Sequence, residues 1–253
     1  MLPSIMRTLR LVLLLAILVV FFGAVFIIFF DQAVFVRRGT IYREEVGEKV
    51  VALTFDDGPS PVWTSKILDV LKEADVRATF FMLGEHVEKY PDVARRVVAE
   101  GHDIGNHTYD HRVLLTYFNV RKLENEIRRT EGIIQKVTGV TTRYFRPPKA
   151  WMTAREKKLI RSMGYEIVLW SLNSKDWVTF DDKYMIKYLM HHVRPGDIIL
   201  FHDSGGAFST EGGDRDETVL AVMRLIERLK EKGWKFVTVT ELLSMTGQNR
   251  GNP

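Results

Sequence analysis

Beyond residue 49 the chain alternates short apolar runs with longer segments of helical periodicity. The apolar runs predict strands at Val50–Thr54, Ala78–Leu83, Asp103–Gly105, Tyr144–Arg146, Ile167–Trp170, Asp197–Phe201 and Lys235–Val239. Apolar residues three or four apart predict helices at Thr64–Glu73, Pro91–Glu100, Val120–Thr138, Ala154–Met163, Asp182–His192, Asp216–Lys232 and Thr240–Met245. Repeated β–α units imply a parallel sheet with helices outside it. About seven units favour a closed or nearly closed barrel over an open sheet, and periodicity leaves closure open.

The N-terminal run Leu11–Phe30 is twenty residues long and has no charged residue. As a helix it spans the roughly 30 Å hydrocarbon core of a membrane. A cleaved signal peptide has a shorter apolar region, about 7–15 residues, that ends in small residues. This run is longer and ends in two phenylalanines, so it predicts an uncleaved signal anchor. Basic residues flank it on both sides, which leaves its orientation open.

We therefore expect four parts. They are a cytoplasmic stub with the signal-anchor helix (1–30), a polar juxtamembrane connector (31–47), an α/β domain (48–246) and a disordered tail (247–253). The net charge of +4 without a dense lysine or arginine block argues against nucleic-acid binding. The chain has no cysteine, which excludes a cysteine-ligated zinc finger and leaves the redox compartment open.

Two adjacent carboxylates follow the first predicted strand, in the sequence TFDDGP. Asp, Gly and Pro are all turn formers, so a simple turn is one interpretation. In α/β barrels, however, reactive side chains lie where strands end and loops begin. Asp56 and Asp57 occupy such a position and are candidates for two different chemical roles.

A second cluster, HTYDH, places His107 and His111 four residues apart. In a helical turn these side chains lie on one face, where both imidazoles can reach one metal ion. The pair alone is also compatible with local packing. Together with a carboxylate from another strand end it would form a His₂Asp site with an open position, as is typical of catalytic zinc. His86 and His102, beside helix ends, are expected to have structural roles.

Three further clusters follow later strands, in YFRPPKAW, LWSLNSKDW and DIILFHDSGG. Arg146 can hold a carboxylate in its ionised form by charge and hydrogen bonds. Trp177 is a candidate pocket wall, although tryptophan is more often simply core. His202 ends an apolar strand and is a candidate for proton transfer, with a structural histidine as the equal alternative.

In chain order TFDDGP, HTYDH, RPP, DW and the I-x-L-x-H-D of Ile198–Asp203 resemble the motifs of the polysaccharide deacetylase family. This family is the NodB-homology domain, or carbohydrate esterase family 4, and the resemblance covers roughly residues 48–245. It implies a distorted (β/α) barrel with one divalent metal ion. Zinc is the first candidate, and cobalt, nickel and manganese are alternatives.

The resemblance also implies roles for individual residues. The implied metal ligands are Asp57, His107 and His111. Asp56 is similar to the general base that activates the metal-bound water, Arg146 to the residue that tethers this base, and His202 to the general acid. The implied substrate-binding residues are Trp177, Leu200, Pro148 and Lys149. Hydrolysis of an acetamide needs a hydroxide, a polarised carbonyl and a proton for nitrogen; a metal supplies the first two, and a carboxylate and a histidine move the protons.

The sequence departs from the family pattern at two positions. Lys149 stands where the family usually has tyrosine. The lysine retains the backbone N–H that the family uses in the oxyanion hole, but its side chain differs. Asn173 stands where the family usually has an aspartate that orients the histidine acid. An asparagine cannot stabilise an imidazolium by charge, so we expect reduced activity or a lower pH optimum from this difference.

The expected function is the removal of N-acetyl groups from an extracytoplasmic amino-sugar polymer, with peptidoglycan as the first candidate. A chitin-like oligomer, an ester-acetylated polymer and a lipid-linked sugar are alternative substrates, and a catalytically weak glycan-binding protein is the alternative class. The expected partners are an envelope glycan and the membrane, without nucleic acid; the sequence gives no oligomeric state. The expected location is a single-pass membrane anchor with the catalytic domain outside the cytoplasm of a bacterial cell.

Overall fold

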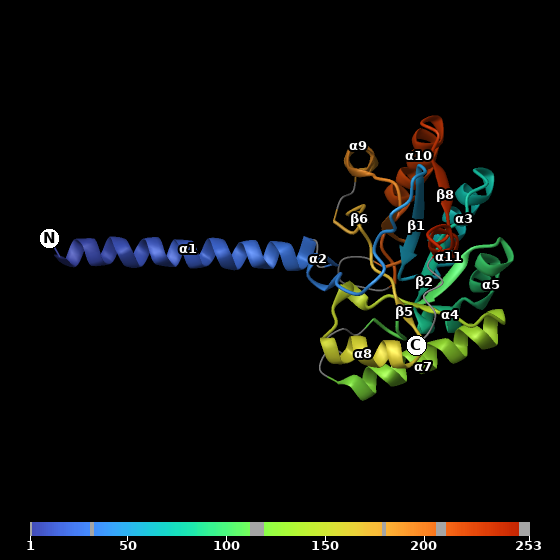
Figure 1. Cartoon of the computed structure of the whole chain (residues 1–253), viewed down its shortest axis with the longest axis horizontal. Helices are drawn as coiled ribbons and strands as arrows, with labels where there is room; N and C mark the ends of the chain where they lie inside the picture. Colours follow the sequence, from blue (N-terminus) through green and yellow to red (C-terminus); the bar gives the residue numbers. More distant parts are fainter. Residues whose placement is uncertain (1, 31–32, 112–118, 179–180, 206–210, 248–253) are drawn as a thin grey trace.

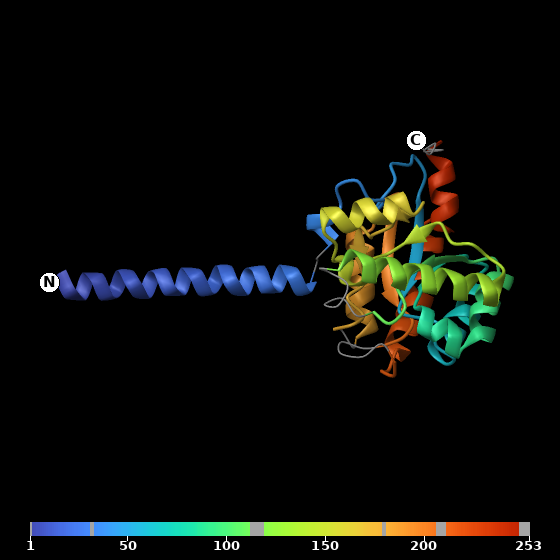
Figure 2. The same ribbon diagram turned by 90° about the horizontal axis from the view of Figure 1, so that it is seen from below.

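The computed structural model describes residues 2–30, 33–111, 119–178, 181–205 and 211–247. A long helix, α1 (Leu2–Phe30), extends away from an α/β domain that contains the rest of the described chain (Figures 1 and 2). Among these residues one helical segment, Met6–Gly23, is long and apolar enough to cross a membrane, and none of it is buried. The C-terminal tail expected at 247–253 lies outside the described residues except for Gly247.

One curled parallel sheet forms the centre of the domain. Its strands are β1 (Val50–Asp56), β2 (Thr79–Met82), β3 (Asp103–Asn106), β4 (Tyr144–Phe145), β5 (Glu166–Ile167), β6 (Leu172–Asn173), β7 (Asp197–His202) and β8 (Lys235–Val237). The order is β5-β4-β3-β2-β1-β7-β6, and β8 pairs with the start of β1. Because β5 and β6 are the end strands of this order, the barrel is incomplete. The predicted α/β barrel of about seven strands is confirmed, with eight strands in the described residues.

Helices cover the outside of the sheet (Figure 1). They are α3 (Trp63–Glu73), α4 (Gly84–Lys89), α5 (Pro91–Ala99), α7 (Val120–Thr138), α8 (Ala154–Ser162), α9 (Asp182–His192), α10 (Asp216–Glu231) and α11 (Val239–Met245), with a 3₁₀ turn η1 (Pro148–Ala150). Every residue of β1 is buried, as expected for a parallel strand covered on both faces. The rings of Phe55, Phe80 and Phe201 stack across β2, β1 and β7 in the largest apolar core.

Strand β6 and helix α4 are among the short elements that were not predicted. Strand β6 has two residues and α4 has six, so neither is long enough to show a repeating apolar pattern. β6 is held by parallel pairing of Leu172 and Asn173 with Ile199 and Leu200 on β7. Tertiary pairing rather than local sequence therefore determines this strand.

The segment expected to be a connector is partly folded onto the domain. A short helix, α2 (Ala33–Val36), follows α1, and Ala33 is fully buried. Ile41 forms a parallel bridge with Val168, and Arg43 forms an antiparallel bridge with Asp197. Residues 33–47 thus extend the domain between β5 and the start of β7, although their composition is polar.

The carboxyl ends of the central strands meet at one edge of the sheet. In the register, Asp56 at the end of β1 lies beside both Phe81 on β2 and His202 on β7. At the same edge, Asn106 at the end of β3 lies beside Phe145 on β4. Side chains that are far apart in the sequence therefore converge at this edge.

Candidate active site

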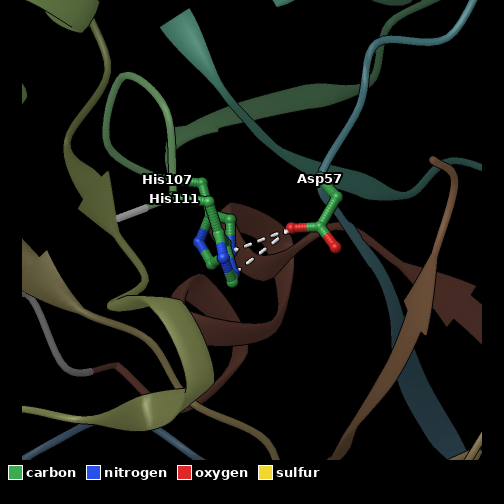
Figure 3. Close-up of side chains that lie close together, drawn as sticks. All are labelled: Asp57, His107 and His111. Atoms are coloured by element: carbon green, nitrogen blue, oxygen red, sulfur yellow. Dashed lines mark ion pairs between the residues drawn. The ribbon is translucent and has the colours of Figure 1, made fainter. Parts of the chain in front are cut away.

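Asp57, His107 and His111 face one another just beyond the ends of β1 and β3 (Figure 3). Asp57 Oδ1 lies 3.4 Å from His107 Nε2 and 3.6 Å from His111 Nε2. One ligand atom from each residue lies within 4.8 Å of the others. Asp57 Oδ1 is buried and has no hydrogen-bond partner among the described residues. A buried, unpaired carboxylate oxygen that faces two imidazole nitrogens fits a divalent metal ion of the zinc type.

The local backbone holds this arrangement in place. Asp57 has a φ of +77° and His111 a φ of +59°, both in the left-handed region that costs energy for residues other than glycine. His107 Nδ1 lies 2.7 Å from the carbonyl oxygen of Arg146. A carbonyl only accepts, so Nδ1 carries the proton and the lone pair of Nε2 is left for a metal.

His86 is a site residue that the sequence did not indicate. Its Nδ1 lies 2.6 Å from the carbonyl oxygen of Asp57, and its side chain is buried in α4. The imidazole therefore donates to the backbone of a candidate ligand and helps to hold its unusual conformation. The only sequence signal was a histidine near a helix end, and that signal is too common to identify a partner.

The electrostatics of two candidate ligands, Asp57 and His111, match a cation site. Burial would lower the pKa of His107, but Asp56 and Asp57 raise it, so a metal ion would displace a proton from this imidazole. Burial alone would raise the pKa of Asp57, but His111, His107 and His202 hold it well below its usual range. Burial lowers the pKa of His111 to about 4, and nearby His107 and Lys149 contribute to this lowering. The carboxylate is thus ionised and His111 is neutral at physiological pH, which are the forms that bind a metal.

Asp56 forms a fully buried ion pair with Arg146. Arg146 Nη1 donates to Asp56 Oδ1 at 2.7 Å and to Thr54 Oγ1 at 2.9 Å. Its other nitrogens donate to the carbonyls of Val168 and Leu169, both at 3.1 Å. A guanidinium has five N–H donors in a rigid plane, so that of Arg146 can bind all these acceptors at once. The hydrogen bond from Arg146 therefore fixes the orientation of the Asp56 carboxylate.

His202, at the end of β7, is paired with Asp176. His202 Nδ1 lies 2.8 Å from Asp176 Oδ1, and the backbone N–H of His202 donates to Oδ2 at 2.8 Å. Asp176 also accepts from Ser174 and Thr218. Burial would lower the pKa of His202, but the charge of Asp176 raises it above its usual value. Nε2 is left directed away from this carboxylate and suited to proton transfer.

The expectation that Asn173 replaces the carboxylate partner of His202 is wrong in this structure. Asn173 Oδ1 accepts from the backbone N–H of Lys175 at 2.8 Å and so serves the turn after β6. Three residues later, Asp176 supplies the carboxylate to His202. Spacing along the chain could not show which side chain reaches the imidazole, because Lys175 between them has a φ of +63° and turns the chain.

The residues expected to bind substrate lie on three segments near this edge. Leu200 is buried on β7, and Trp177 is half-buried directly after Asp176. Pro148 is buried in η1, whereas Lys149 is exposed there with a φ of +53°. Lys149 is close enough to influence the pKa of His111. All these segments belong to strands or loops at the carboxyl edge of the sheet.

The family model for polysaccharide deacetylase matches residues 43–168. A peptidoglycan-N-acetylglucosamine deacetylase of Bacillus cereus is 37% identical over 198 residues, which cover 78% of this chain and 89% of that protein. The chain belongs to the polysaccharide deacetylase family. This confirms the expected family and makes the chain a polysaccharide deacetylase, a hydrolase, by family.

Two further comparisons within the family agree. A chitooligosaccharide deacetylase of Rhizobium leguminosarum bv. trifolii is 39% identical over 198 residues, covering 75% of this chain and 89% of that protein. A crystal structure of a peptidoglycan N-acetylglucosamine deacetylase with a bound N-oxidanyl-benzamide superposes with a TM-score of 0.75 at 35% identity. It covers 86% of this chain and 98% of that chain. The fold of this polysaccharide deacetylase is therefore that of the family.

Proposed function

We propose that this polysaccharide deacetylase removes N-acetyl groups from an extracytoplasmic amino-sugar polymer, with peptidoglycan as the first substrate to test. One observation carries the proposal. The Asp57/His107/His111 cluster, the Asp56–Arg146 pair and the Asp176–His202 pair converge at one edge of the barrel. Together they provide the metal ligands, the base and the acid that amide hydrolysis requires.

Asp57, His107 and His111 would hold the divalent metal ion, with zinc as the first candidate. When bound, such an ion supplies Lewis-acid chemistry by lowering the pKa of water and polarising the acetyl carbonyl. The three residues provide one anionic and two neutral donors, and Arg146 fixes the tautomer of His107 through its backbone carbonyl. His86 holds the carbonyl of Asp57.

Asp56 and His202 would move the protons. Asp56 Oδ1 is occupied by Arg146, whereas Oδ2 lies 3.8 Å from His107 Nε2 and is directed into the site as a general base. His202 would protonate the leaving amine, because Asp176 stabilises its protonated form by charge. Base and acid have separate partners, so the two can hold opposite protonation states at one pH.

The acetyl group and the sugar would bind beside these residues. Leu200 and Trp177 would form the apolar walls for the acetyl methyl, and Pro148 with Lys149 would border the sugar. The names of two relatives support an N-acetylated amino-sugar polymer, one of them peptidoglycan and the other chitooligosaccharide. A chitin-like oligomer is therefore the second candidate substrate.

The alternative class, a catalytically weak glycan-binding protein, loses one of its two supports. Asn173 was expected to deprive His202 of a carboxylate, but Asp176 provides one. Lys149 remains as a departure, and it affects the border of the sugar site rather than the proton-transfer groups. An ester-acetylated or lipid-linked sugar stays an alternative substrate for the same chemistry.

The helix α1 supports the expected location. We infer that it anchors the protein in a membrane by a single span, with the catalytic domain on the extracytoplasmic side, where an envelope glycan lies. Its exposed apolar segment Met6–Gly23 has no cover from the domain. Burial in lipid would remove this surface from water.

Acetate release tests the function. The full chain, in detergent and supplied with zinc, is incubated with peptidoglycan, with N-acetylglucosamine oligomers and with an acetylated xylan. We expect release from peptidoglycan, and a loss of roughly 10²-fold or more in Asp56→Asn and His202→Gln. The first variant keeps the shape of the carboxylate, the second keeps a polar N–H donor, and both lose the capacity for proton transfer. The exposed variant Lys136→Gln is the control. Zinc bound without acetate release from any polymer would support the glycan-binding alternative.

A further inference from the structure

Helix α8 presents a basic surface beside the segment that follows α1. We use the term α8 basic surface for Arg38, Arg155, Lys157, Lys158 and Arg161. A cavity of about 380 Å³ opens here, with Val36 and Met152 as its apolar part and Lys157, Lys158 and Arg161 as its basic part. Residues 155, 158 and 161 are exposed and three apart, so their side chains follow one side of the helix.

These charges have no carboxylate partners within the described part of the chain. Lys157 Nζ donates to the backbone carbonyls of Val36 at 3.0 Å and Arg38 at 2.8 Å, and Arg161 donates to the carbonyl of Gly39. The acidic residue of this helix, Glu156, is buried and caps the helix through the N–H of Thr153. Burial and the charge of Arg161 lower the pKa of Lys157, as expected where cations gather without an anion.

The α8 basic surface must lie close to the membrane if α1 crosses it. Val36 lines the cavity and is six residues beyond Phe30, the last residue of α1. Six residues span at most about 20 Å when fully extended. Both views place α8 on the side of the domain where α1 joins it (Figures 1 and 2). The tether therefore holds these cations within reach of lipid headgroups.

We propose that the α8 basic surface binds anionic phospholipid headgroups of the membrane in which α1 is embedded. The proposal rests on the anchoring role of α1 proposed above. Unpaired cations beside an apolar cavity match a phosphate joined to an acyl chain, and each basic residue near an anionic surface strengthens attraction about fivefold. The tether alone permits the domain to rotate, whereas docking of α8 fixes its orientation.

Docking has a consequence for the active site. Helix α8 begins four residues after Ala150, the end of η1, and η1 carries Pro148 and Lys149. Binding of α8 to headgroups would hold this border of the site near the membrane surface. Glycan close to the membrane would then be presented to the site in preference to distant glycan.

A single-cysteine fluorescence experiment tests the proposal, and the cysteine-free chain needs no background substitution. Ser162→Cys, at the exposed end of α8, is labelled in the full chain, which is reconstituted in vesicles that contain a headgroup-linked quencher. Gln135→Cys is the control, because it lies in the last turn of α7, at the end far from α1 (Figures 1 and 2). The vesicles contain either phosphatidylcholine alone or phosphatidylcholine with phosphatidylglycerol.

We expect quenching at position 162 to increase at least twofold when phosphatidylglycerol is present, and quenching at position 135 to stay unchanged. Arg155→Glu with Lys158→Glu should remove the increase, because reversal of two charges weakens docking by about 25-fold or more. The matched control, Lys136→Glu with Lys232→Glu, makes the same change in net charge on exposed residues elsewhere. Acetate release from a soluble oligomer should be unchanged in both double variants.

Three outcomes would overturn the proposal. Equal quenching at position 162 in both lipids would show that charge does not dock α8. If both double variants lost the phosphatidylglycerol-dependent increase in quenching equally, the increase would depend on net charge rather than on α8. Binding of polyphosphate that depends on Arg155 and Lys158, without a lipid effect, would assign the surface to a soluble polyanion. Release of the chain from vesicles by alkaline carbonate would instead contradict the anchor, and absent acetate release would contradict only the enzymatic function.

Discussion

At the scale of single residues, two adjacent aspartates have different partners. The left-handed φ of Asp57 turns its carboxylate toward His107 and His111. Asp56, the last residue of the extended strand β1, is directed to Arg146 instead. Adjacent side chains on an extended chain already point to opposite sides, and the change in backbone conformation completes their separation.

The pairing of His202 with Asp176 predicts a shift in pH dependence. A general acid must be protonated, so activity falls as the pH rises through its pKa. Asp176 raises the pKa of His202, so Asp176→Asn should move this basic limb to lower pH and reduce kcat/KM by roughly 10²-fold. The pH–rate profile of the zinc-loaded full chain measures both effects.

Asn173→Asp is the matched comparison for this prediction. Asn173 accepts from the N–H of Lys175 and does not pair with His202, and an aspartate can accept the same bond. Its pH–rate profile should therefore coincide with that of the unsubstituted chain. A basic limb that moves in Asn173→Asp but stays in place in Asp176→Asn would reverse the assignment.

The contact of His86 with the backbone of Asp57 predicts an effect on metal affinity. His86→Phe keeps a ring in the buried site but removes the donor to the Asp57 carbonyl. Loss of a partner that orients a ligand weakens metal binding by about 10–100-fold. Competition with a zinc chelator measures the change without any need for activity.

Two variants serve as controls for His86. His86→Gln retains an N–H donor and should recover much of the affinity. His102 is also a buried histidine, but its Nδ1 accepts from the N–H of Ala78, away from the ligands. His102→Gln should leave zinc affinity unchanged. If a folded His86→Phe chain bound zinc as tightly as the unsubstituted chain, His86 would have no role in positioning Asp57.

At the scale of elements, Arg146 joins three segments of the barrel. It extends from the end of β4 to Thr54 and Asp56 on β1 and to two carbonyls that follow β5. Its guanidinium also lies 4.0 Å from the ring of Phe81 on β2. The side chain of Arg146 thus donates hydrogen bonds to two backbone carbonyls, a hydroxyl and a carboxylate at this edge. Arg146 is completely buried.

Removal of Arg146 should destabilise the domain strongly. Arg146→Met leaves the buried charge of Asp56 without its partner, which costs about 3–5 kcal/mol of unfolding free energy. Arg143→Met is the control, because Arg143 is exposed and its ion pair with Glu166 is worth less than about 1 kcal/mol. Denaturant unfolding of the full chain in detergent compares them. Equal effects of the two substitutions would contradict the structural role of Arg146.

At the scale of the whole molecule, the chain combines a helix that is long and apolar enough to cross a membrane with an α/β domain. The candidate active site lies at the carboxyl edge of the sheet in that domain. Residues 33–47 pack on that domain, so little free chain separates α1 from it. If α1 crosses a membrane as proposed, it would therefore restrict how far the site can travel from that membrane. Such a restriction would suit the proposed envelope polymer, which cannot diffuse to the enzyme.

The expected topology can be measured with single cysteines in the full chain. Lys136→Cys lies on the exposed face of α7 and should react with a membrane-impermeant maleimide on intact cells. Ser4→Cys precedes the apolar segment Met6–Gly23 and should react only after the membrane is permeabilised. Labelling of both positions on intact cells would contradict a single span with a cytoplasmic N-terminus.

The sequence by itself determined the order of β and α units, the apolar N-terminal helix and the residues of the five motifs. These features are local, because hydrophobic periodicity and the ends of strands can be recognised from short stretches of consecutive residues. It could not determine β6 or the folding of residues 33–47 onto the domain, since both depend on pairing with distant strands. Such pairing leaves no repeating pattern in the segment itself.

Tertiary structure decided which side chains meet. Only the folded chain shows that Asp176 rather than Asn173 pairs with His202, and that His86 holds the carbonyl of Asp57. Both outcomes depend on left-handed backbone residues and on helix placement, which turn side chains by amounts that spacing does not encode. The residue types set the available chemistry, and the geometry at the carboxyl edge of the sheet determined which side chains pair.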